Sequence, residues 1–363
     1  MVKGRSRTAR ATMPVAALAV LALTAGCTDG AGATPTITTT ARAGVAPVPP
    51  GQGAYFGAWV PPSGAAEPAP RATGSASPTG SASPSGSASA QARSVPEQVR
   101  DFERDLGRRL DIVQNYRGWK SAFPSREDSA LLGGDNRYLL LTWAGADTKE
   151  IVAGEHDALI RERARAVRAT GKPIFLRWQR DMDKEGLRDR VHGPAEFIAA
   201  WKHIRQIFQR ERVDNVAWVW CPTAGGFGSR NAPSYYPGDD QVDWICVDAQ
   251  PGGDYDYRDL SETLKLFLEW ADDRPKPIMV AEFGVPRSYG ARRAEWLRKA
   301  TETLQNPQVK AVVYFNSDEQ AEEPRDERRR YAVTDDKQAV SALRELATTP
   351  YFNPQNLPVT SGG

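Results

Sequence analysis

Acidic side chains stand at or just after the ends of three apolar segments of the chain. Asp181 follows residues 173–178, Asp248 ends residues 242–248, and Glu282 lies near the end of residues 277–283. Two carboxyls that face each other can cleave a glycosidic bond, because one protonates the leaving group while the other attacks the anomeric carbon as an anion. A single acid at such a place more often caps the following helix. The three acids therefore indicate glycoside hydrolysis if the fold brings two of them together.

Aromatic and polar side chains gather near the same segment ends, where flat rings could stack on the faces of sugars. Packing between a sheet and its loops is the simpler role for any one of these Trp and Tyr residues. Taken together, the residues form a candidate binding wall for a sugar substrate. Its members are Trp59, Tyr116, Trp143, Arg177, Trp178, Trp220, Tyr235 and Asp248.

Eight short apolar segments have the length and composition of buried β-strands. They are residues 53–60, 110–116, 138–143, 173–178, 216–221, 242–248, 277–283 and 309–316. Segments with helical periodicity follow most of them, beginning with a capping-box pattern at 94–97 and continuing at about 155–170, 194–211, 258–272, 290–305 and 336–347. Continuous apolar strands that alternate with helices are typical of a parallel sheet covered on both faces.

Eight such units over about 250 residues predict an α/β fold of the (β/α)8 TIM barrel type, in a single domain. A doubly wound open sheet is the alternative, but no glycine-rich phosphate-binding turn follows any of the segments. Active sites of TIM barrels lie at the C-terminal ends of the strands. The prediction therefore places Asp181, Asp248 and Glu282 at one end of the barrel.

Low-complexity sequence sets the expected domain boundaries. Residues 28–52 and 65–94 consist almost entirely of Ala, Gly, Ser, Thr and Pro, which cannot bury a core. Between them, the aromatic run at 53–60 has the composition of a strand. We therefore expect a disordered tether at 27–52, a barrel at 53–348 and a C-terminal tail at 349–363. A disordered low-complexity insertion at 61–94 would follow the first strand.

The first 26 residues have the features of an export signal. Lys3, Arg5, Arg7 and Arg10 precede an apolar run that is too short to span a bilayer. The run ends in Leu-Thr-Ala-Gly-Cys at 23–27, which resembles the cleavage and lipidation site of bacterial lipoproteins. An ordinary signal peptide with a chance cysteine is the alternative. We expect a lipid on Cys27, and hence an extracellular protein that is anchored to the cell membrane or else secreted.

The charge balance and the cysteine count exclude several classes of protein. Removal of residues 1–26 takes away four basic side chains and leaves 43 basic against 45 acidic ones, a net charge of −2. A nucleic-acid binder would carry a basic surface instead. Three cysteines and three scattered histidines form no regular ligand pattern, so we expect neither a metal nor a cofactor. Cys221 and Cys246 could form a disulfide or remain two buried thiols, and the sequence leaves both open.

Several segments, taken in order, resemble one enzyme family. They are Gly-Ala-Tyr-Phe-Gly-Ala-Trp-Val at 53–60, Phe-Leu-Arg-Trp at 175–178 leading to Met-Asp at 182–183, Trp-Val-Trp-Cys-Pro at 218–222, Tyr-Tyr-Pro-Gly-Asp at 235–239, Val-Asp-Trp-Ile at 242–245 and Val-Ala-Glu-Phe-Gly at 280–284. Together they resemble glycoside hydrolase family 26, the β-mannanase and lichenase family of clan A TIM barrels. The resemblance runs through about residues 53–346.

The resemblance implies a retaining mechanism with two carboxyls. Glu282 matches the family's nucleophile on strand seven, and Arg177 would keep that nucleophile ionised. Asp181 occupies the acid/base position after strand four, where the family has a glutamate, and Arg180 precedes it where mannanases often have histidine. The shorter side chain widens a carboxyl gap that retaining enzymes hold at about 5 to 5.5 Å, and a nearby guanidinium lowers the carboxyl pKa. Asp248 is the alternative proton donor.

The leading hypothesis is an exported, monomeric, endo-acting β-glycoside hydrolase with Glu282 as nucleophile and Asp181 as acid/base. Its substrate would be a β-linked polysaccharide such as mannan or mixed-linkage glucan, or an oligosaccharide of the same kind. The alternative is a catalytically impaired lipoprotein of the same fold that only binds carbohydrate. A solute-binding lipoprotein of two lobes is a third possibility, but eight strand–helix units argue against it.

Overall fold

The computed structural model describes Met1 and residues 37–61, 93–132, 137–228, 231–251, 257–318 and 326–353. Residues 2–26 of the expected signal peptide, Cys27 and nearly all of the expected insertion at 61–94 lie outside these residues. Within the described part of the chain, no helix combines the length and the hydropathy needed to cross a bilayer.

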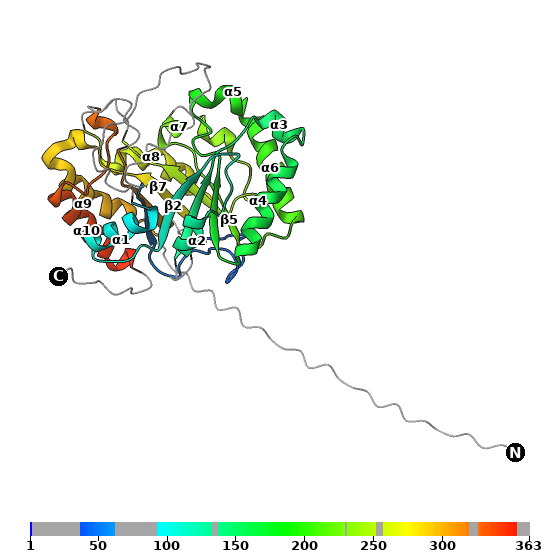
Figure 1. The fold of residues 1–363 in the computed structure, drawn as a ribbon, viewed down its shortest axis with the longest axis horizontal. Coiled ribbons are helices and arrows are strands. Elements are labelled where there is room, and N and C mark those ends of the chain that lie inside the picture. Colours follow the sequence, from blue (N-terminus) through cyan, green and yellow to red (C-terminus); the bar gives the residue numbers. More distant parts are fainter. Residues whose placement is uncertain are drawn as a thin grey trace, which may run out of the picture. The chain divides into compact units, whose positions relative to one another are not determined.

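Eight parallel strands close into a barrel with helices around it (Figure 1). Each strand pairs with the next along the chain, and β8 pairs with β1 to close the ring. All eight predicted strands are confirmed, and the closed ring excludes the open-sheet alternative. The strands are β1 (Tyr55–Trp59), β2 (Ile112–Arg117), β3 (Tyr138–Trp143), β4 (Ile174–Trp178), β5 (Val216–Trp220), β6 (Trp244–Asp248), β7 (Ile278–Phe283) and β8 (Val309–Phe315).

The six predicted helices are confirmed, and shorter ones are added. The predicted set is α1 (Val95–Leu106), α4 (Asp157–Thr170), α6 (Pro194–Arg210), α8 (Leu260–Ala271), α9 (Arg293–Leu304) and α10 (Lys337–Thr348). The added α-helices are α2 (Arg126–Leu132), α3 (Thr148–Val152), α5 (Arg188–Val191) and α7 (Ala224–Gly228), each too short to show a periodicity. The 3-10 helices are η1 (Glu185–Leu187), η2 (Ala232–Tyr235), η3 (Arg287–Arg292), η4 (Glu327–Arg329) and η5 (Pro350–Phe352).

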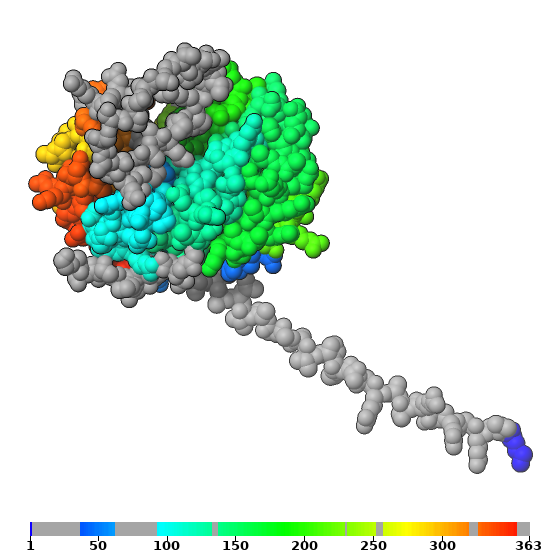
Figure 2. Space-filling view, in the orientation of Figure 1, coloured from blue at the N-terminus to red at the C-terminus, as the bar shows by residue number. Residues whose placement is uncertain are grey.

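Alternate side chains of each strand point into the barrel and out toward the helices. The interior holds a small apolar cluster that includes Leu140, Phe175, Val219, Trp244 and Met279. A much larger apolar cluster lies between strands and helices and contains most of the tryptophans. In the space-filling view, the chain from cyan to green forms one continuous surface on this face (Figure 2).

Part of the expected tether packs against the barrel. Within residues 37–52, Ala46 is buried, the Pro47 carbonyl accepts from Trp244 Nε1 at 3.4 Å, and Thr38 Oγ1 donates to the Pro275 carbonyl at 2.9 Å. Trp244 begins β6, so these residues lie at the N-terminal ends of the strands. The prediction of a disordered tether was wrong for residues 37–52, because these contacts are made by Thr and Arg side chains and by main-chain carbonyls, which a count of apolar side chains does not reveal.

The barrel also extends past residue 348, where the tail was expected to begin. Phe352 is fully buried, and the N–H of Ala54 donates to the Tyr351 carbonyl at 2.7 Å. Gly53 permits this close approach, because its φ is 65° and a Cβ there would lie 2.1 Å from the Tyr351 oxygen. Residues 349–353 therefore belong to the domain, and only residues 354–363 of the expected tail lie outside the described part.

A fully buried ion pair joins the start of the sheet to the last helix. Arg108 Nη2 lies 2.8 Å from Asp111 Oδ2, and both side chains are inaccessible to solvent. The same Asp111 oxygen accepts from the N–H of Phe56 at 2.9 Å. Arg108 Nη1 donates to the carbonyls of Ala347, at 2.8 Å, and Phe352.

Arg108→Met is expected to lower the free energy of unfolding by about 3 to 5 kcal/mol, because it leaves the buried Asp111 carboxyl without its cation. Urea denaturation followed by tryptophan fluorescence measures the change. Glu345→Gln is the control, since it breaks an ion pair with Arg298 in which both side chains are about half exposed. That pair should contribute less than about 1 kcal/mol, and equal losses for both variants would contradict the prediction.

Candidate active site

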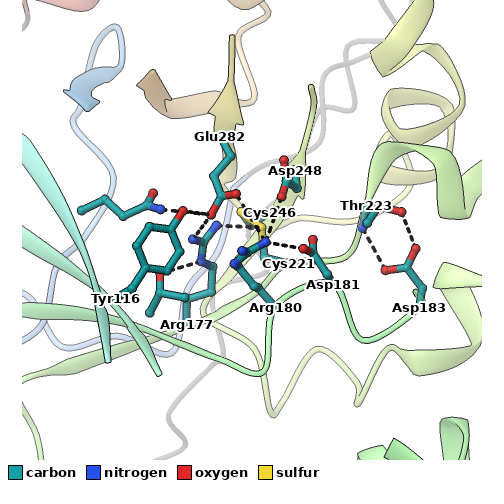
Figure 3. The surroundings of a disulfide bond; sticks show 12 residues. Tyr116, Arg177, Arg180, Asp181, Asp183, Cys221, Thr223, Cys246, Asp248 and Glu282 are labelled. Atoms are coloured by element: carbon teal, nitrogen blue, oxygen red, sulfur yellow. Dashed lines mark hydrogen bonds and ion pairs between the residues drawn. A yellow bond between two sulfur atoms is a disulfide. The ribbon is translucent and has the colours of Figure 1, made fainter. Parts of the chain in front are cut away.

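A β-bulge near the end of β7 turns Glu282 into the barrel. The register of β7 on β8 is irregular between Val280 and Phe283, and Glu282 has a φ of 53°, in the left-handed region. Val280 and Phe283 belong to the outer cluster and Ala281 to the inner one. A regular strand would therefore point residue 282 outward, and the bulge re-aims it. The Glu282 side chain lies fully buried among polar groups (Figure 3).

Donors from β2 and β4 surround one oxygen of Glu282. Its Oε1 accepts from Gln114 Nε2 at 3.0 Å and from the Tyr116 hydroxyl at 2.5 Å, and it forms an ion pair with Arg177 Nη2. Arg177 is fully buried, and its Nε donates to Thr142 Oγ1 at 3.0 Å. Charge-assisted contacts of this kind favour the carboxylate over the carboxylic acid.

These contacts fix the ionisation of Glu282. Burial raises its pKa, but the charges of Arg180 and Arg177, with hydrogen bonds from Asp248 and Tyr116, outweigh burial and hold the pKa well below its usual range. Burial and the charge of Glu282 raise the pKa of Tyr116 well above its usual value, so its hydroxyl stays a donor. An ionised carboxylate is the form that a nucleophile requires.

The loop after β4 carries Asp181 on an unusual backbone. Gln179 and Asp181 have φ values of 45° and 58°, a conformation that is costly for non-glycine residues and clusters at functional sites. Asp181 Oδ2 accepts from Lys184 Nζ at 2.8 Å and forms an ion pair with Arg180 Nη1. Burial raises the pKa of Asp181, but the charges of Arg180 and Lys184 outweigh burial and lower it. Asp181 is thus an anion between two cations, whereas a general acid must hold a proton.

Asp248 at the end of β6 is the third buried carboxyl, and its environment is the opposite. Burial and the negative charges of Glu282 and Asp181 raise its pKa well above the usual range, although the charges of Lys184 and Arg180 oppose them. A carboxyl in this setting keeps its proton at a pH where its neighbours have lost theirs.

One guanidinium connects the three acids. Arg180 Nη1 contacts Asp181 Oδ2, Asp248 Oδ2 at 3.5 Å and Glu282 Oε2 at 3.4 Å (Figure 3). Its guanidinium also lies 5.3 Å from the centre of the Tyr116 ring. The fold therefore brings together the three acids that the sequence placed at strand ends. Arg180 Nη1 thus lies within 3.5 Å of one oxygen of each acid.

Cys221 and Cys246 are joined by a disulfide, which answers the question that the sequence left open. The bond links the residue after β5 to the middle of β6. The carbonyl of Cys221 accepts from the N–H of Asp181 at 3.0 Å, and the next carbonyl, of Pro222, accepts from the N–H of Asp248 at 2.9 Å. The disulfide therefore braces the segment that positions two of the three acids.

Two aromatic residues of the predicted wall lie beside the acids. Tyr116 contacts Glu282 directly, and the ring of Trp59 meets the Tyr116 ring edge-to-face at 4.8 Å. Trp59 also packs with Phe315 and Tyr331. Together with Arg177 and Asp248, Trp59 and Tyr116 are the members of the wall that the structure brings together.

The other four members of the wall lie between the strands and the helices. Trp143, Trp178 and Trp220 are fully buried in the outer cluster. Trp178 stacks on Phe197 of α6, and Trp220 Nε1 donates to the carbonyl of Tyr235, which is itself buried in the same layer. Placing them at a sugar was wrong. For the three tryptophans, nearness to a strand end does not decide which way the side chain faces, whereas the position's parity along the strand does. Tyr235 lies on η2 and packs in the outer layer.

Sequence reasoning also missed two residues near the acids. Gln114 lies two positions before Tyr116 on β2 and therefore lies on the same face of the strand. This spacing could have identified Gln114 from the sequence. Lys184 comes from the loop after β4 and has no such pattern. Asp183 holds this loop in place, since its Oδ1 accepts from the N–H of Thr223 at 2.9 Å.

Three acids in one place also raise the question of a cation site. In the described part of the chain, no group of three or more His, Cys, Asp and Glu side chains is arranged to hold a metal ion. The positive charge beside these acids comes from Arg177, Arg180 and Lys184.

Comparison with curated proteins gives relatives among glycan-cleaving enzymes, while no protein-family model matches the chain. Endoglucanase H of Acetivibrio thermocellus is 26% identical over 275 residues, which cover 70% of this chain and 29% of that protein. A β-1,3-xylanase from Vibrio sp. is 25% identical over 142 residues, 38% of this chain and 28% of that protein. The chain thus spans less than a third of the length of these two relatives.

Solved structures share the barrel. A β-mannanase of glycoside hydrolase family 26 from Bacteroides ovatus superposes with a TM-score of 0.54 at 12% identity, over 83% of this chain and 90% of that one. The catalytic domain of an endo-β-1,4-mannanase of the same family from Bacillus sp. JAMB-750 gives 0.53 at 12% identity, over 83% and 87%. At this identity the likeness shows the (β/α)8 fold. Together, the matches are consistent with the family resemblance of the sequence motifs.

Proposed function

We propose that the chain is a retaining β-glycoside hydrolase of the family 26 type and that Glu282 is its nucleophile. The position of Glu282 carries the proposal. The bulge aims its carboxyl into the barrel, and Gln114, Tyr116 and Arg177 hold it oriented and ionised. A fixed carboxylate of this kind suits attack on an anomeric carbon.

The reaction proceeds in two displacements. Glu282 attacks the anomeric carbon while a neighbouring carboxylic acid gives its proton to the departing oxygen, and a glycosyl ester forms. The same neighbour then takes a proton from water, which attacks the anomeric carbon and releases Glu282. Asp181, from the sequence motif, and Asp248 are the two candidates for this second carboxyl.

The substrate is proposed to be a β-linked polysaccharide, with mannan and mixed-linkage glucan first, cleaved internally. The purified chain is incubated with mannan, glucomannan, lichenan and β-1,3-xylan, and the products are separated by chromatography. Proton NMR of early products reads the configuration at the new reducing end. We expect oligosaccharides with retained β configuration. Inverted products would contradict the retaining mechanism, and no product on any β-glycan or aryl β-glycoside would contradict the hydrolase.

A carbohydrate-binding protein without turnover is the second candidate. The contact of Arg180 with all three acids favours this second candidate. The guanidinium lies against Glu282 Oε2 and must be displaced before that oxygen can attack a sugar, so a chain that keeps this contact would not cleave its ligand. Calorimetric titration with manno-oligosaccharides and gluco-oligosaccharides separates the two. Binding that survives for hours without cleavage would favour the second candidate.

Export, a lipid on Cys27, attachment to the membrane and a monomeric state complete the proposal. The motif at 23–27 supports the lipid. Metabolic labelling with a fatty acid should mark the full-length chain and not its Cys27→Ser variant. Light scattering of the purified chain measures its mass in solution.

A further inference from the structure

The two candidate proton donors are held very differently. Asp181 Oδ2 meets two cations, Lys184 Nζ at 2.8 Å and Arg180 Nη1 at a shorter distance. Among the described residues, the Asp248 carboxyl has one ion pair, with Arg180 Nη1 at 3.5 Å. Protonating Asp181 forfeits two close ion pairs in a buried place, whereas protonating Asp248 forfeits one long contact. The site therefore favours a proton on Asp248.

The second carboxylate oxygen of Glu282, Oε2, also indicates that Asp248 is the protonated acid. Oε1 has three donors, whereas the buried Oε2 has an ion pair with Arg180 Nη1 at 3.4 Å but no hydrogen bond of good geometry among the described residues. A buried acceptor left without a donor is unfavourable. Arg180 Nη1 lies 3.5 Å from Asp248 Oδ2 and 3.4 Å from Glu282 Oε2, so the two carboxyls are neighbours. Two neighbouring carboxyls can share a hydrogen bond only when one of them is protonated. A proton on Asp248 supplies the donor that Glu282 lacks.

We propose that Asp248, and not Asp181, is the proton donor of this site. The inference rests on the proposed hydrolase function and departs from the family motif, which points to Asp181. In the resting site the Asp248 proton lies toward Glu282. When a sugar enters, the proton passes to the glycosidic oxygen as its bond to the anomeric carbon breaks and the bond to Glu282 forms. Asp248 is left as an anion and takes a proton from the attacking water in the second step.

Asp181 then has a different part, as the fixed anion that holds Arg180 and Lys184. Its N–H is tied to the Cys221 carbonyl at 3.0 Å, and its Oδ2 holds both cations. Loss of its charge would free Arg180 without removing the proton that the reaction transfers. Asp181 is therefore a positioning residue on this assignment.

The assignment predicts a pH profile with a definite sign. The charged and titratable groups that face Asp248 are Glu282, Asp181, Arg180, Lys184 and Tyr331. Burial and the two anions raise the Asp248 pKa more than the cations lower it, while the Glu282 pKa is lowered. The value of kcat/KM should fall in acid as Glu282 gains a proton, and in alkali as Asp248 loses one.

Asp248→Asn and Asp181→Asn are compared on aryl β-glycosides with a graded series of leaving groups and on the natural glycan. For Asp248→Asn we expect kcat/KM on the glycan to fall by about 100-fold to 10,000-fold. The glycosyl-enzyme should still form at a near-normal rate from dinitrophenyl glycosides. The alkaline limb of the pH profile of kcat/KM should be lost. Azide should restore turnover and give a β-glycosyl azide. For Asp181→Asn we expect the alkaline limb and the shallow leaving-group dependence of the wild type to remain. Asp189→Asn, at an exposed position of α5, is the control.

The outcomes distinguish a failure of the hydrolase function from a failure of the assignment of Asp248 as the proton donor. If the wild type cleaves none of these β-glycosides, the hydrolase function is overturned. If the wild type is active and Asp181→Asn shows the leaving-group signature and azide rescue, Asp181 is the donor and the assignment is overturned. Equal loss on all leaving groups in Asp248→Asn also overturns it, because that marks a positioning role. Should Asp248→Asn fail to fold, the pH profile of Asp181→Asn alone decides, since the alkaline limb must survive there.

Discussion

Glu282→Gln is expected to lower kcat on any substrate of this protein by about 10,000-fold or more. Glutamine keeps the shape of the side chain and can still accept from Gln114 and Tyr116, so the barrel should fold. It cannot form the glycosyl ester, because an amide is a poor nucleophile at this centre. Single-turnover kinetics measure the loss, and circular dichroism checks the fold.

Two further measurements make this result specific to a nucleophile. In Glu282→Ala, where the smaller side chain leaves room for an anion, azide should attack in place of the missing carboxylate. The product should be an α-glycosyl azide, the opposite anomer from the one expected for a missing proton donor. Glu295→Gln removes an exposed carboxyl that pairs with Lys299 and should leave kcat unchanged. A Glu282→Gln variant that retains more than about a tenth of the activity would exclude Glu282 as the nucleophile.

Arg177→Met should shift the acid limb of kcat/KM to higher pH and lower kcat by about 100-fold or more. Arg177 is fully buried and pairs with Glu282 Oε1, and its charge is one of the causes that lower the Glu282 pKa. Without it the protonated form of Glu282 persists to higher pH, so activity is lost at pH values where the wild type still works. A pH series of kcat/KM measures the shift.

The same substitution also removes one partner of a buried ion pair, so the free energy of unfolding should fall by about 3 kcal/mol. Arg298→Met is the matched control, because its partner Glu345 and its own side chain are about half exposed. An acid limb that stays in place in Arg177→Met would mean that Arg177 does not set the ionisation of Glu282.

The barrel is predictable from the sequence because its signals are local and repeated. A strand buried on both faces must be apolar throughout, so segments such as 174–178 and 278–283 differ clearly from the amphipathic helices between them. The strand-end rule then places Asp181, Asp248 and Glu282 at one end, where the structure brings them together. Short helices such as α3 have too few residues for a periodicity to appear.

The direction of individual side chains could not be predicted in the same way. Trp178 and Arg177 are neighbours at the end of β4, yet one faces α6 and the other faces Glu282. Strand parity explains that pair once the register is known. Glu282 breaks parity through the bulge, and no residue type there announces a left-handed backbone. The protonation difference between Asp181 and Asp248 depends on Lys184 and Arg180, whose reach only the folded loop defines.

The left-handed backbone at Gln179, Asp181 and Glu282 has a consequence for protein engineering. These are three of the five described non-glycine residues with positive φ, and each costs about 1 to 3 kcal/mol that the rest of the core must offset. Selection for heat resistance alone would favour substitutions that relax this backbone, and those substitutions would release the acids from their fixed directions. Thermostable forms that still turn over substrate should therefore be sought by varying the outer helices while the ends of β4 and β7 are left untouched.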